Sequence, residues 1–304
     1  MKQEIDVLLA TYNGEKYLED FLKSLEVQKQ VIVNLIVSDD GSSDSTLAII
    51  KEYSGRFNNF FLFRGPGVGP AGNFSFLLSK SSSPYFAFAD QDDVWDEDHL
   101  TKSICRLNET QSDFTSCPVR LMKNESIFGT WPKYRFSPTL SANFFENQVR
   151  GCTIVATSKA RELFLNHRPT SWIMHDWWYA LIALSCLNVV FSDEPELQYR
   201  IHENNFTNSQ KSLFEKLGKL IKLNEAWAPH LQLKELLDTF QIHMKPEARI
   251  EVARVIKCLE SRNLFRRLCF GNLRQRYRMS LIENFSLKVV LVLGIWKTTK
   301  RGDA

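Results

Sequence analysis

The first hundred residues alternate between short apolar runs and segments whose apolar side chains recur every three or four positions. Such runs are typical of strands and such spacing of helices. Strands are expected at 5–10, 31–38, 59–63 and 85–89, and helices at 16–26, 46–53, 73–79 and 98–108. This alternation predicts an α/β fold with a parallel sheet covered by helices.

The rest of the chain divides into two parts by pattern. Further strands are expected at 152–156, 189–192 and 197–201, and helices at 159–166 and 176–187, whereas 113–150 gives no clear pattern. Beyond about residue 209 the pattern is mainly helical, with basic residues interleaved. We therefore expect an α/β domain over 1–208 and a helical region over 209–304.

Each of the first four predicted strands ends in a polar loop. In order along the chain, the loops contain TYNGE, DDGSSDST, GPGVGPAGN and DQDDVW. Ligands of open parallel sheets bind beyond the carboxyl ends of the strands. The four loops are therefore expected to converge on one crevice.

Three carboxylates, Asp90, Asp92 and Asp93, follow the apolar run 85–89. Carboxylates this close together raise one another's pKa unless a positive group lies among them. A hard cation such as Mg²⁺, held by one or two carboxylates and by substrate phosphates, is the usual partner. The simpler alternative is a solvated acidic turn ahead of a helix.

Two further groups of acidic and aromatic residues are candidates for substrate contacts. Asp39 and Asp40 follow the second strand and could accept hydrogen bonds from a ribose or a base, although turn chemistry alone favours such residues. Asp176 begins a predicted helix and could be a general base beside a sugar platform formed by Trp177 and Trp178. A helix cap and core packing are the alternatives.

Arg200 and His202 end the last predicted strand. A guanidinium fork suits phosphate oxygens, and a neutral imidazole can bind a divalent metal or polarise a leaving group. A structural histidine is the alternative for His202.

A glycine-rich loop supports a rival interpretation. Three glycines fit the GxGxxG pattern between a strand and a helix: Gly67, Gly69 and Gly72. The pattern is typical of nicotinamide-cofactor dehydrogenases. Pro66 and Pro70 argue against it, because proline removes backbone N–H donors from a pyrophosphate cradle.

The order of these motifs resembles the family 2 glycosyltransferases, and in particular their bacterial rhamnosyltransferase-like branch. The resemblance spans roughly residues 4–208 and is carried by LLATYNGEKYLEDFLKSL, IVSDDGSSDST, FADQDDVW, MHDWW and YRIHENN. It implies a GT-A fold, in which a Rossmann-like nucleotide-binding sheet is fused to an acceptor-binding half. Residues 1–100 would bind the nucleotide sugar, and 101–208 would form the acceptor side.

The resemblance also implies roles for individual residues. Nucleotide-sugar contacts are expected from Thr11, Tyr12, Asn13, Asp39, Asp40, Asn73 and Asp90. Asp90 and Asp92 would form the DxD pair, with Asp92 as the direct metal ligand, and Asp176 would be the catalytic base. Acceptor or leaving-group contacts are expected from Trp177, Trp178, Arg200 and His202. His175 stands where the family usually has an acidic residue.

The implied activity is an inverting, metal-dependent transfer with Mg²⁺ or Mn²⁺ as cofactor. The donor would be a dTDP- or UDP-sugar, with L-rhamnose as the first guess. The acceptor would be a hydroxyl of a growing, lipid-linked bacterial cell-surface glycan such as O-antigen or capsule. No nucleic-acid partner is expected, and the oligomeric state stays open. The alternatives are an NAD-type oxidoreductase and a non-catalytic glycan-binding relative.

Charge is distributed unevenly along the chain. Residues 1–209 contain 19 basic and 26 acidic side chains, and 210–304 contain 19 and 9. The C-terminal region interleaves arginines with apolar residues: Arg262, Arg266, Arg267, Arg274, Arg276 and Arg278 with Leu264, Phe265, Leu268, Phe270 and Leu273. This pattern is typical of a helix attracted to anionic lipid. Helices that pack on the catalytic domain or on a second subunit are the alternative.

Cysteines and apolar runs indicate the compartment. The six cysteines are scattered without a CxxC pair, which predicts neither a zinc site nor a disulfide framework. The N-terminus lacks the apolar stretch of a signal peptide. The apolar run Val289–Trp296 is eight residues long, and a spanning helix needs about 20. We therefore expect a cytoplasmic protein, with peripheral contact to the cytoplasmic face of a membrane as a hypothesis.

Overall fold

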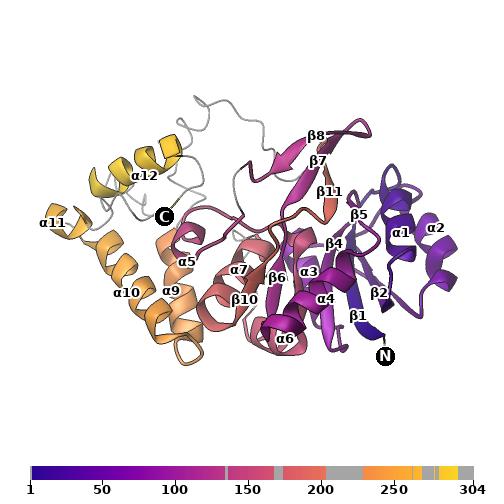
Figure 1. The fold of residues 1–304 in the computed structure, drawn as a ribbon, viewed down its shortest axis with the longest axis horizontal. Coiled ribbons are helices and arrows are strands. Elements are labelled where there is room, and N and C mark those ends of the chain that lie inside the picture. The colour runs from indigo at the N-terminus through magenta and orange to yellow at the C-terminus, as the bar shows by residue number, and fades with distance from the viewer. Residues whose placement is uncertain are drawn as a thin grey trace. The chain divides into compact units, whose positions relative to one another are not determined.

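The protein was analysed as a computed structural model, which describes residues 2–133, 136–167, 174–202, 229–261, 263–268, 277 and 281–293 (Figure 1). The chain forms two compact units. Unit 1 comprises Met1–Pro138 and Val149–His202, and unit 2 comprises Thr139–Gln148 and Glu203–Ala304. The domain boundary expected after residue 208 lies outside the described residues.

Unit 1 is built on a seven-stranded sheet with the strand order β10-β6-β9-β4-β1-β2-β3. Its strands are β1 (Gln3–Thr11), β2 (Val31–Asp39), β3 (Asn59–Arg64), β4 (Tyr85–Asp90), β6 (Phe114–Ser116), β9 (Val155–Thr157) and β10 (Val189–Phe191). β3, β2, β1 and β4 are mutually parallel, which confirms the predicted parallel sheet. β9 runs antiparallel to both β4 and β6, so the complete sheet is mixed.

Helices cover both faces of this sheet. They are α1 (Leu18–Glu26), α2 (Thr46–Tyr53), α3 (Pro70–Leu78), α4 (His99–Thr110), α6 (Ser158–Leu165) and α7 (His175–Cys186), with the 3₁₀ turns η1 (Ser54–Arg56) and η2 (Gly151–Thr153). Side chains alternate between the faces of a strand. Ile5 and Val7 of β1 therefore join a core with α1, α2 and α4, whereas Phe88 of β4 packs against Phe74 of α3 and Tyr179 of α7.

The segment 113–150, which gave no clear pattern, contains two of the four strands of a second sheet. This four-stranded sheet has the order β5-β11-β7-β8, formed by β5 (Val94–Trp95), β7 (Val119–Lys123), β8 (Ser126–Trp131) and β11 (Leu197–Arg200). β7 and β8 form a hairpin whose turn residues Asn124 and Glu125 have φ of 49° and 61°. Glycine usually marks such a turn, and its absence hid the hairpin in the sequence.

One predicted strand was partly wrong. The segment 152–156 begins as η2 and only then continues as β9. The Thr153 side chain donates to the Arg150 carbonyl at 2.7 Å, and the Ile154 N–H donates to the Gly151 carbonyl at 3.0 Å. These local bonds favour a turn over an extended strand.

Unit 2 is helical in its described part, as the sequence predicts. Its helices are α5 (Leu140–Asn143), α9 (Pro229–Phe240), α10 (Pro246–Glu260), α11 (Leu264–Arg267) and α12 (Leu281–Leu293). Among the described helices, none is long and apolar enough to cross a membrane. Several residues of the predicted basic helix lie outside the described residues: Arg262, Phe270, Leu273, Arg274, Arg276 and Arg278.

Candidate active site

The polar loops converge at the carboxyl edge of the parallel strands, as predicted. Asp39 at the end of β2 receives a hydrogen bond from the Thr11 hydroxyl of β1 at 2.8 Å. Asp39 also accepts from the N–H groups of Gly41 and Ser42 at 3.0 and 2.8 Å, and from the Ser42 hydroxyl at 2.5 Å. The Asp39 side chain is buried. Its hydrogen bonds hold the end of β1 and the loop after β2 in place.

Asp40 directly follows β2 at the same edge of the sheet. It is half-buried, and its Oδ1 accepts a hydrogen bond from the Gly67 N–H at 3.1 Å. One amide of the glycine-rich loop is therefore committed to a protein carboxylate. Gly65 packs so closely that an added Cβ would lie 2.1 Å from Asp40 Oδ1, which keeps this part of the loop free of side chains.

Tyr12 and Asn13 extend over the first loop. The Gln91 side chain receives the Tyr12 N–H and donates to the Tyr12 carbonyl, both at 3.0 Å, while the Tyr12 ring is 58% exposed. Asn13 has a positive φ of 46° and its Oδ1 accepts the Ser43 N–H at 2.9 Å. The backbone is thus fixed while an aromatic face remains open to a ligand.

Asn73 is buried at the start of α3. Its Nδ2 donates to the Ser38 carbonyl of β2 at 3.0 Å, and its Oδ1 has no hydrogen-bond partner in the described part of the chain. Asn73 therefore connects the first turn of α3 to the end of β2.

The predicted carboxylates gather beside these loops. Partial burial, and then the negative charges of Asp92 and Asp176, raise the pKa of Asp90 to about 8, while Arg150 opposes the rise. Asp93 is fully buried, and burial followed by Asp92 and Asp90 raises its pKa well above the usual range. Asp92 and Asp176, which belong to two different motifs, thus both act on Asp90.

The donor atoms of this cluster suit a hard divalent cation. Asp90, Asp93 and Cys152 offer ligand atoms within 4.8 Å of one another, and Asp92 lies next to them in the chain. Burial, and then the charges of Asp92 and Asp176, disfavour the ionised form of the Asp90 carboxyl, and a bound cation would favour it. Carboxylate oxygens are the ligands that Mg²⁺ prefers, and they also suit Mn²⁺. The residues therefore fit the cofactor expected from the sequence.

Asp176 and His175 begin α7 but face different surroundings. Asp176 is half-buried, and its Oδ1 accepts the Trp177 N–H at 2.7 Å. The His175 ring stacks on Phe74 at 4.0 Å between centroids. Burial lowers the pKa of His175 to about 4, against the pull of Asp176. His175 is thus neutral at pH 7, and neither ring nitrogen has a hydrogen-bond partner among the described residues.

The two tryptophans differ in exposure. Trp178 is fully buried in the core and its ring lies 5.6 Å from His167, so packing accounts for its position. Trp177 is half-buried, and its backbone N–H donates to the Asp176 side chain.

Arg200 and His202 hold the acidic loop from the side of β11. His202 Nε2 lies 2.7 Å from Asp92 Oδ2. The Arg200 side chain is 3% exposed; it donates to the Asp92 carbonyl at 3.0 Å and also pairs with Asp20 and Glu125. Arg200 is therefore occupied by protein acceptors and positions the loop, whereas His202 is in direct contact with a candidate metal ligand.

Sequence reasoning missed Cys152 and Arg150. The Cys152 thiol makes a hydrogen bond with Asp93, and burial raises the pKa of this thiol. Arg150 acts on Asp90 electrostatically. Neither residue belongs to a recognisable motif, because both reach the site through the pairing of β9 with β4.

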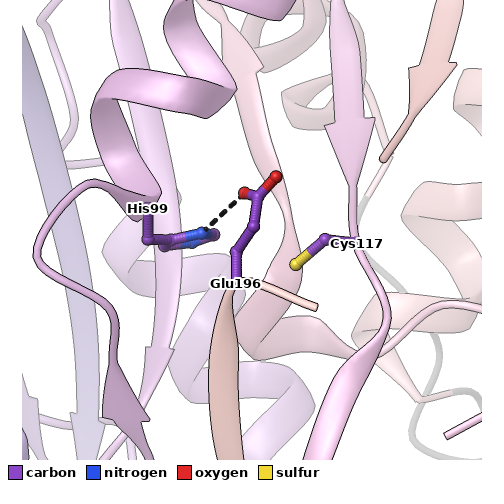
Figure 2. A group of neighbouring side chains, drawn as sticks. All are labelled: His99, Cys117 and Glu196. Carbon is purple, nitrogen blue, oxygen red and sulfur yellow. Dashed lines mark hydrogen bonds and ion pairs between the residues drawn. The ribbon is translucent and has the colours of Figure 1, made fainter. Parts of the chain in front are cut away.

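A second buried cluster lies elsewhere in unit 1 (Figure 2). His99 Nδ1 is 3.1 Å from Glu196 Oε2, and Arg106 pairs with the other oxygen of Glu196. His99, Cys117 and Glu196 could surround an ion by distance alone. The adjacent guanidinium competes for the same carboxylate, so the cluster is best explained as an ion-pair network between α4 and β11.

Comparison with protein families and curated proteins gives consistent matches. The family described as "Glycosyl transferase family 2" matches residues 6–171. The dTDP-rhamnosyl transferase RfbG of Shigella flexneri is 28% identical over 241 residues, covering 72% of this chain and 80% of the relative. An uncharacterized glycosyltransferase of Rickettsia typhi is 24% identical over 226 residues, covering 71% and 70%.

Solved structures with the same fold were also found. S. aureus TarS in complex with UDP-GlcNAc has a TM-score of 0.60 at 16% identity, covering 97% of this chain and 89% of that chain. The mannosyltransferase PcManGT from Pyrobaculum calidifontis, in complex with GDP-Man and Mn²⁺, has a TM-score of 0.54 at 13% identity, covering 97% and 88%.

Proposed function

The chain belongs to glycosyl transferase family 2 and has the GT-A fold, and from this premise we propose that it transfers a sugar from a nucleotide-sugar donor to an acceptor hydroxyl with inversion. The observation that carries the proposal is the convergence of Asp39, Asp90, Asp92 and Asp176 at the carboxyl edge of one parallel sheet. Family membership favours this activity over the dehydrogenase alternative.

The nucleoside end of the donor is assigned to the first two loops. The exposed Tyr12 ring offers a flat face for a base, and stacking of a base on an aromatic ring is a common mode of nucleotide recognition. Asp40 directly follows β2 at the same edge of the sheet and has a second carboxylate oxygen to offer a ribose hydroxyl. Buried Asp39 supports both loops.

The diphosphate end is assigned to the acidic loop. Asp90 and Asp92 would hold Mg²⁺ or Mn²⁺, with His202 fixing the orientation of Asp92 through the 2.7 Å contact. A divalent cation at this place supplies Lewis-acid stabilisation of the negative charge on the departing diphosphate. PcManGT, which has the same fold, was solved with Mn²⁺, which supports this choice of cofactor.

Asp176 is proposed as the general base. Its carboxylate would take the proton of the acceptor hydroxyl as the oxygen forms a bond to the anomeric carbon. The bond from that carbon to the phosphate oxygen breaks at the same time, and its electron pair leaves with the nucleoside diphosphate. Asp176 lies close enough to Asp90 to raise its pKa, so base and donor site share one electrostatic environment.

The donor sugar is proposed to be L-rhamnose, carried by dTDP. Support comes from the curated relative named dTDP-rhamnosyl transferase, which is 28% identical over most of both chains. UDP-sugars are the alternative, because TarS was solved with UDP-GlcNAc. The proposed acceptor is a lipid-linked glycan of a bacterial surface polysaccharide.

Calorimetric titration of UDP and dTDP, each with and without Mn²⁺, tests this function. We expect one nucleotide to bind the wild type in a Mn²⁺-dependent way, and Asp92→Ala to abolish the effect of the metal. Glu109→Gln, an exposed carboxylate change on α4, is the control and should bind as the wild type does. Binding of NAD(H) without binding of either nucleotide would refute the proposal.

A peripheral contact with an anionic membrane is proposed for unit 2. In α11 and the residue after it, Leu264, Phe265 and Leu268 are 47%, 81% and 49% exposed, and Arg266 beside them is exposed as well. Phe285 of the neighbouring α12 is 64% exposed. Apolar side chains flanked by arginine favour the surface of an anionic bilayer, where a lipid-linked acceptor would be found.

A further inference from the structure

Arg150 is held between two aromatic rings. The guanidinium carbon lies 4.3 Å from the centroid of the Trp131 ring and 4.2 Å from that of Tyr199. Trp131 ends β8 and Tyr199 lies in β11, so the second sheet supplies both rings. Cation–π contacts of this kind are attractive, and together they hold the guanidinium in place beside the second sheet.

The two ring contacts give the Nε–H of this guanidinium no hydrogen-bond acceptor. A guanidinium carries five N–H donors in its own plane. Arg150 Nε is buried and has no hydrogen-bond partner among the described residues. Arg106 and Arg200, in the same unit, are instead paired with carboxylates. Because a buried donor without an acceptor is costly, the position of Arg150 calls for an in-plane anion.

The carboxylate cluster lies within electrostatic reach of Arg150. Arg150 immediately precedes η2, which packs beside β4, the strand that ends at Asp90. A divalent cation on Asp90 and Asp92 would repel this guanidinium unless an anion lay between them. Phosphate oxygens can meet both, because they accept from a guanidinium fork and bind a metal ion at once.

We propose that Arg150, clamped by Trp131 and Tyr199, binds the diphosphate of the nucleotide-sugar donor. This inference rests on the proposed function. As the bond between the anomeric carbon and the phosphate oxygen breaks, its electron pair stays on the nucleoside diphosphate, and the Arg150 N–H groups stabilise the added charge. The acceptor proton still passes to Asp176, so atoms and charge balance.

A different role for Arg150 is to neutralise the carboxylates without touching the donor. The two roles predict different effects on diphosphate binding when the charge of Arg150 is removed. A diphosphate ligand would bind less tightly without Arg150. If Arg150 only offsets negative charge, its loss would leave diphosphate binding intact and would strengthen Mn²⁺ binding, because a repulsive cation has been removed.

The test is calorimetric titration of the nucleoside diphosphate and the matching monophosphate, in Mn²⁺, into Arg150→Ala, Arg150→Lys and the wild type. A charge-assisted hydrogen bond to phosphate is worth about 10- to 100-fold in affinity. We expect Arg150→Ala to lose that much diphosphate affinity and to lose less for the monophosphate. Arg150→Lys keeps the charge but not the planar fork, and its affinity should fall between the two.

Arg56 provides a matched control. It also lies over an aromatic ring, at 4.2 Å from Tyr53, but it pairs with Glu26 at the opposite edge of the sheet. Arg56→Ala should bind both nucleotides as the wild type does. Trp131→Leu keeps the arginine and removes one ring, and it should cost part of the diphosphate affinity. Circular dichroism of each variant reports whether it is folded.

The outcomes separate the two levels of inference. Diphosphate affinity that is unchanged in folded Arg150→Ala, above all with tighter Mn²⁺ binding, would overturn the role of Arg150 and leave the transferase function standing. A wild-type protein that binds no nucleoside diphosphate in Mn²⁺ would overturn the proposed function and this inference together.

Discussion

His175 and Asp176 show how two adjacent residues take different roles. His175 is 4% exposed and lies against Gly151, where an added Cβ would come within 2.8 Å of the imidazole Nε2. Its pKa near 4 makes it an uncharged aromatic spacer at pH 7. Asp176 is partly open and faces Asp90 electrostatically. The neutral His175 thus packs in the core and positions its neighbour Asp176, the proposed base, next to the donor site.

The low pKa of His175 predicts an acid-sensitive stability. An unfolded histidine binds its proton near pH 6.5, whereas folded His175 does so only near pH 4. Between these values the unfolded state binds more protons, so this contribution is fully present above pH 6.5 and is lost as the pH falls. By pH 5 the free energy of unfolding should drop by roughly 2 kcal/mol from this group. Asp176 is the charged group that faces the ring.

Urea unfolding of wild type and His175→Phe at pH 7 and pH 5, in a metal chelator, measures this effect. Phenylalanine keeps the stacking on Phe74 and removes the titration, so the variant should lose less stability between the two pH values. The same pH dependence in both proteins would contradict the assignment.

Asp176→Asn should abolish most of the turnover and leave donor binding intact. Loss of a general base typically costs about 10²- to 10⁴-fold in rate, and the amide keeps the shape of the side chain. Initial rates and nucleotide titrations on the same protein check this, with Glu109→Gln as the control. A variant with normal kcat would show that another group accepts the acceptor proton.

At the scale of elements, a buried ion-pair network connects α4 to the start of β11. Glu196, just before β11, accepts hydrogen bonds from Ser103 and His99 of α4 and pairs with Arg106. Burial alone would raise the pKa of Glu196, but His99 and Arg106 outweigh it and lower the pKa below its usual range. The fold therefore stabilises the ionised form of Glu196, and this carboxylate holds β11 in place beside the site.

Glu196→Gln should destabilise the protein by about 3 kcal/mol, because removal of one partner leaves Arg106 and His99 without their anion. The matched control is Glu97→Gln, since Glu97 pairs with Lys29 on the surface with both side chains 57% exposed. Such exposed pairs contribute about 0–1 kcal/mol. Equal effects of the two changes on the midpoint of urea unfolding would show that the buried network contributes little.

The sequence pattern predicted most helices and strands of unit 1. It failed where tertiary contacts determine that a segment forms a strand. Thr46–Tyr53 is the helix that the sequence indicated, and the first four strands agree to within two residues at each end. These segments carry regular apolar periods. In the hairpin β7–β8, β8 is mostly exposed and the pairing has a register shift between Leu121 and Met122. β7 also pairs with β11, which is distant in sequence.

At the scale of the whole molecule, the two units differ in charge and in exposed apolar surface. Unit 1 carries the acidic site, and the C-terminal region has the excess of basic residues counted in the sequence. Within unit 2, α11 lies beside α12, and Phe265 and Phe285 are 81% and 64% exposed. Phenylalanines at such exposure are unfavourable in water, which supports contact with a lipid surface.

Flotation with liposomes tests this contact. The wild type should float with anionic vesicles and stay at the bottom with neutral ones, and high salt should weaken the binding. Phe265→Ser combined with Phe285→Ser should abolish flotation. The control Ile242→Ser removes an apolar side chain that is 83% exposed between α9 and α10 and should float as before. Wild-type protein that stays at the bottom with both vesicle types would contradict the proposed membrane contact.

The sequence by itself determined the parallel sheet, the edge that carries the polar loops and the motifs of the transferase family. These three features follow from the spacing of apolar residues along the chain and from residue types at fixed positions in the motifs. Neither depends on contacts between distant parts of the chain. Only the tertiary structure decided how each side chain is used. It placed Asp39 under the loops, occupied Arg200 with protein acceptors, made His175 neutral, and brought Arg150 to the carboxylates. Burial and charge at a position depend on strands far apart in the chain, and no local pattern records them.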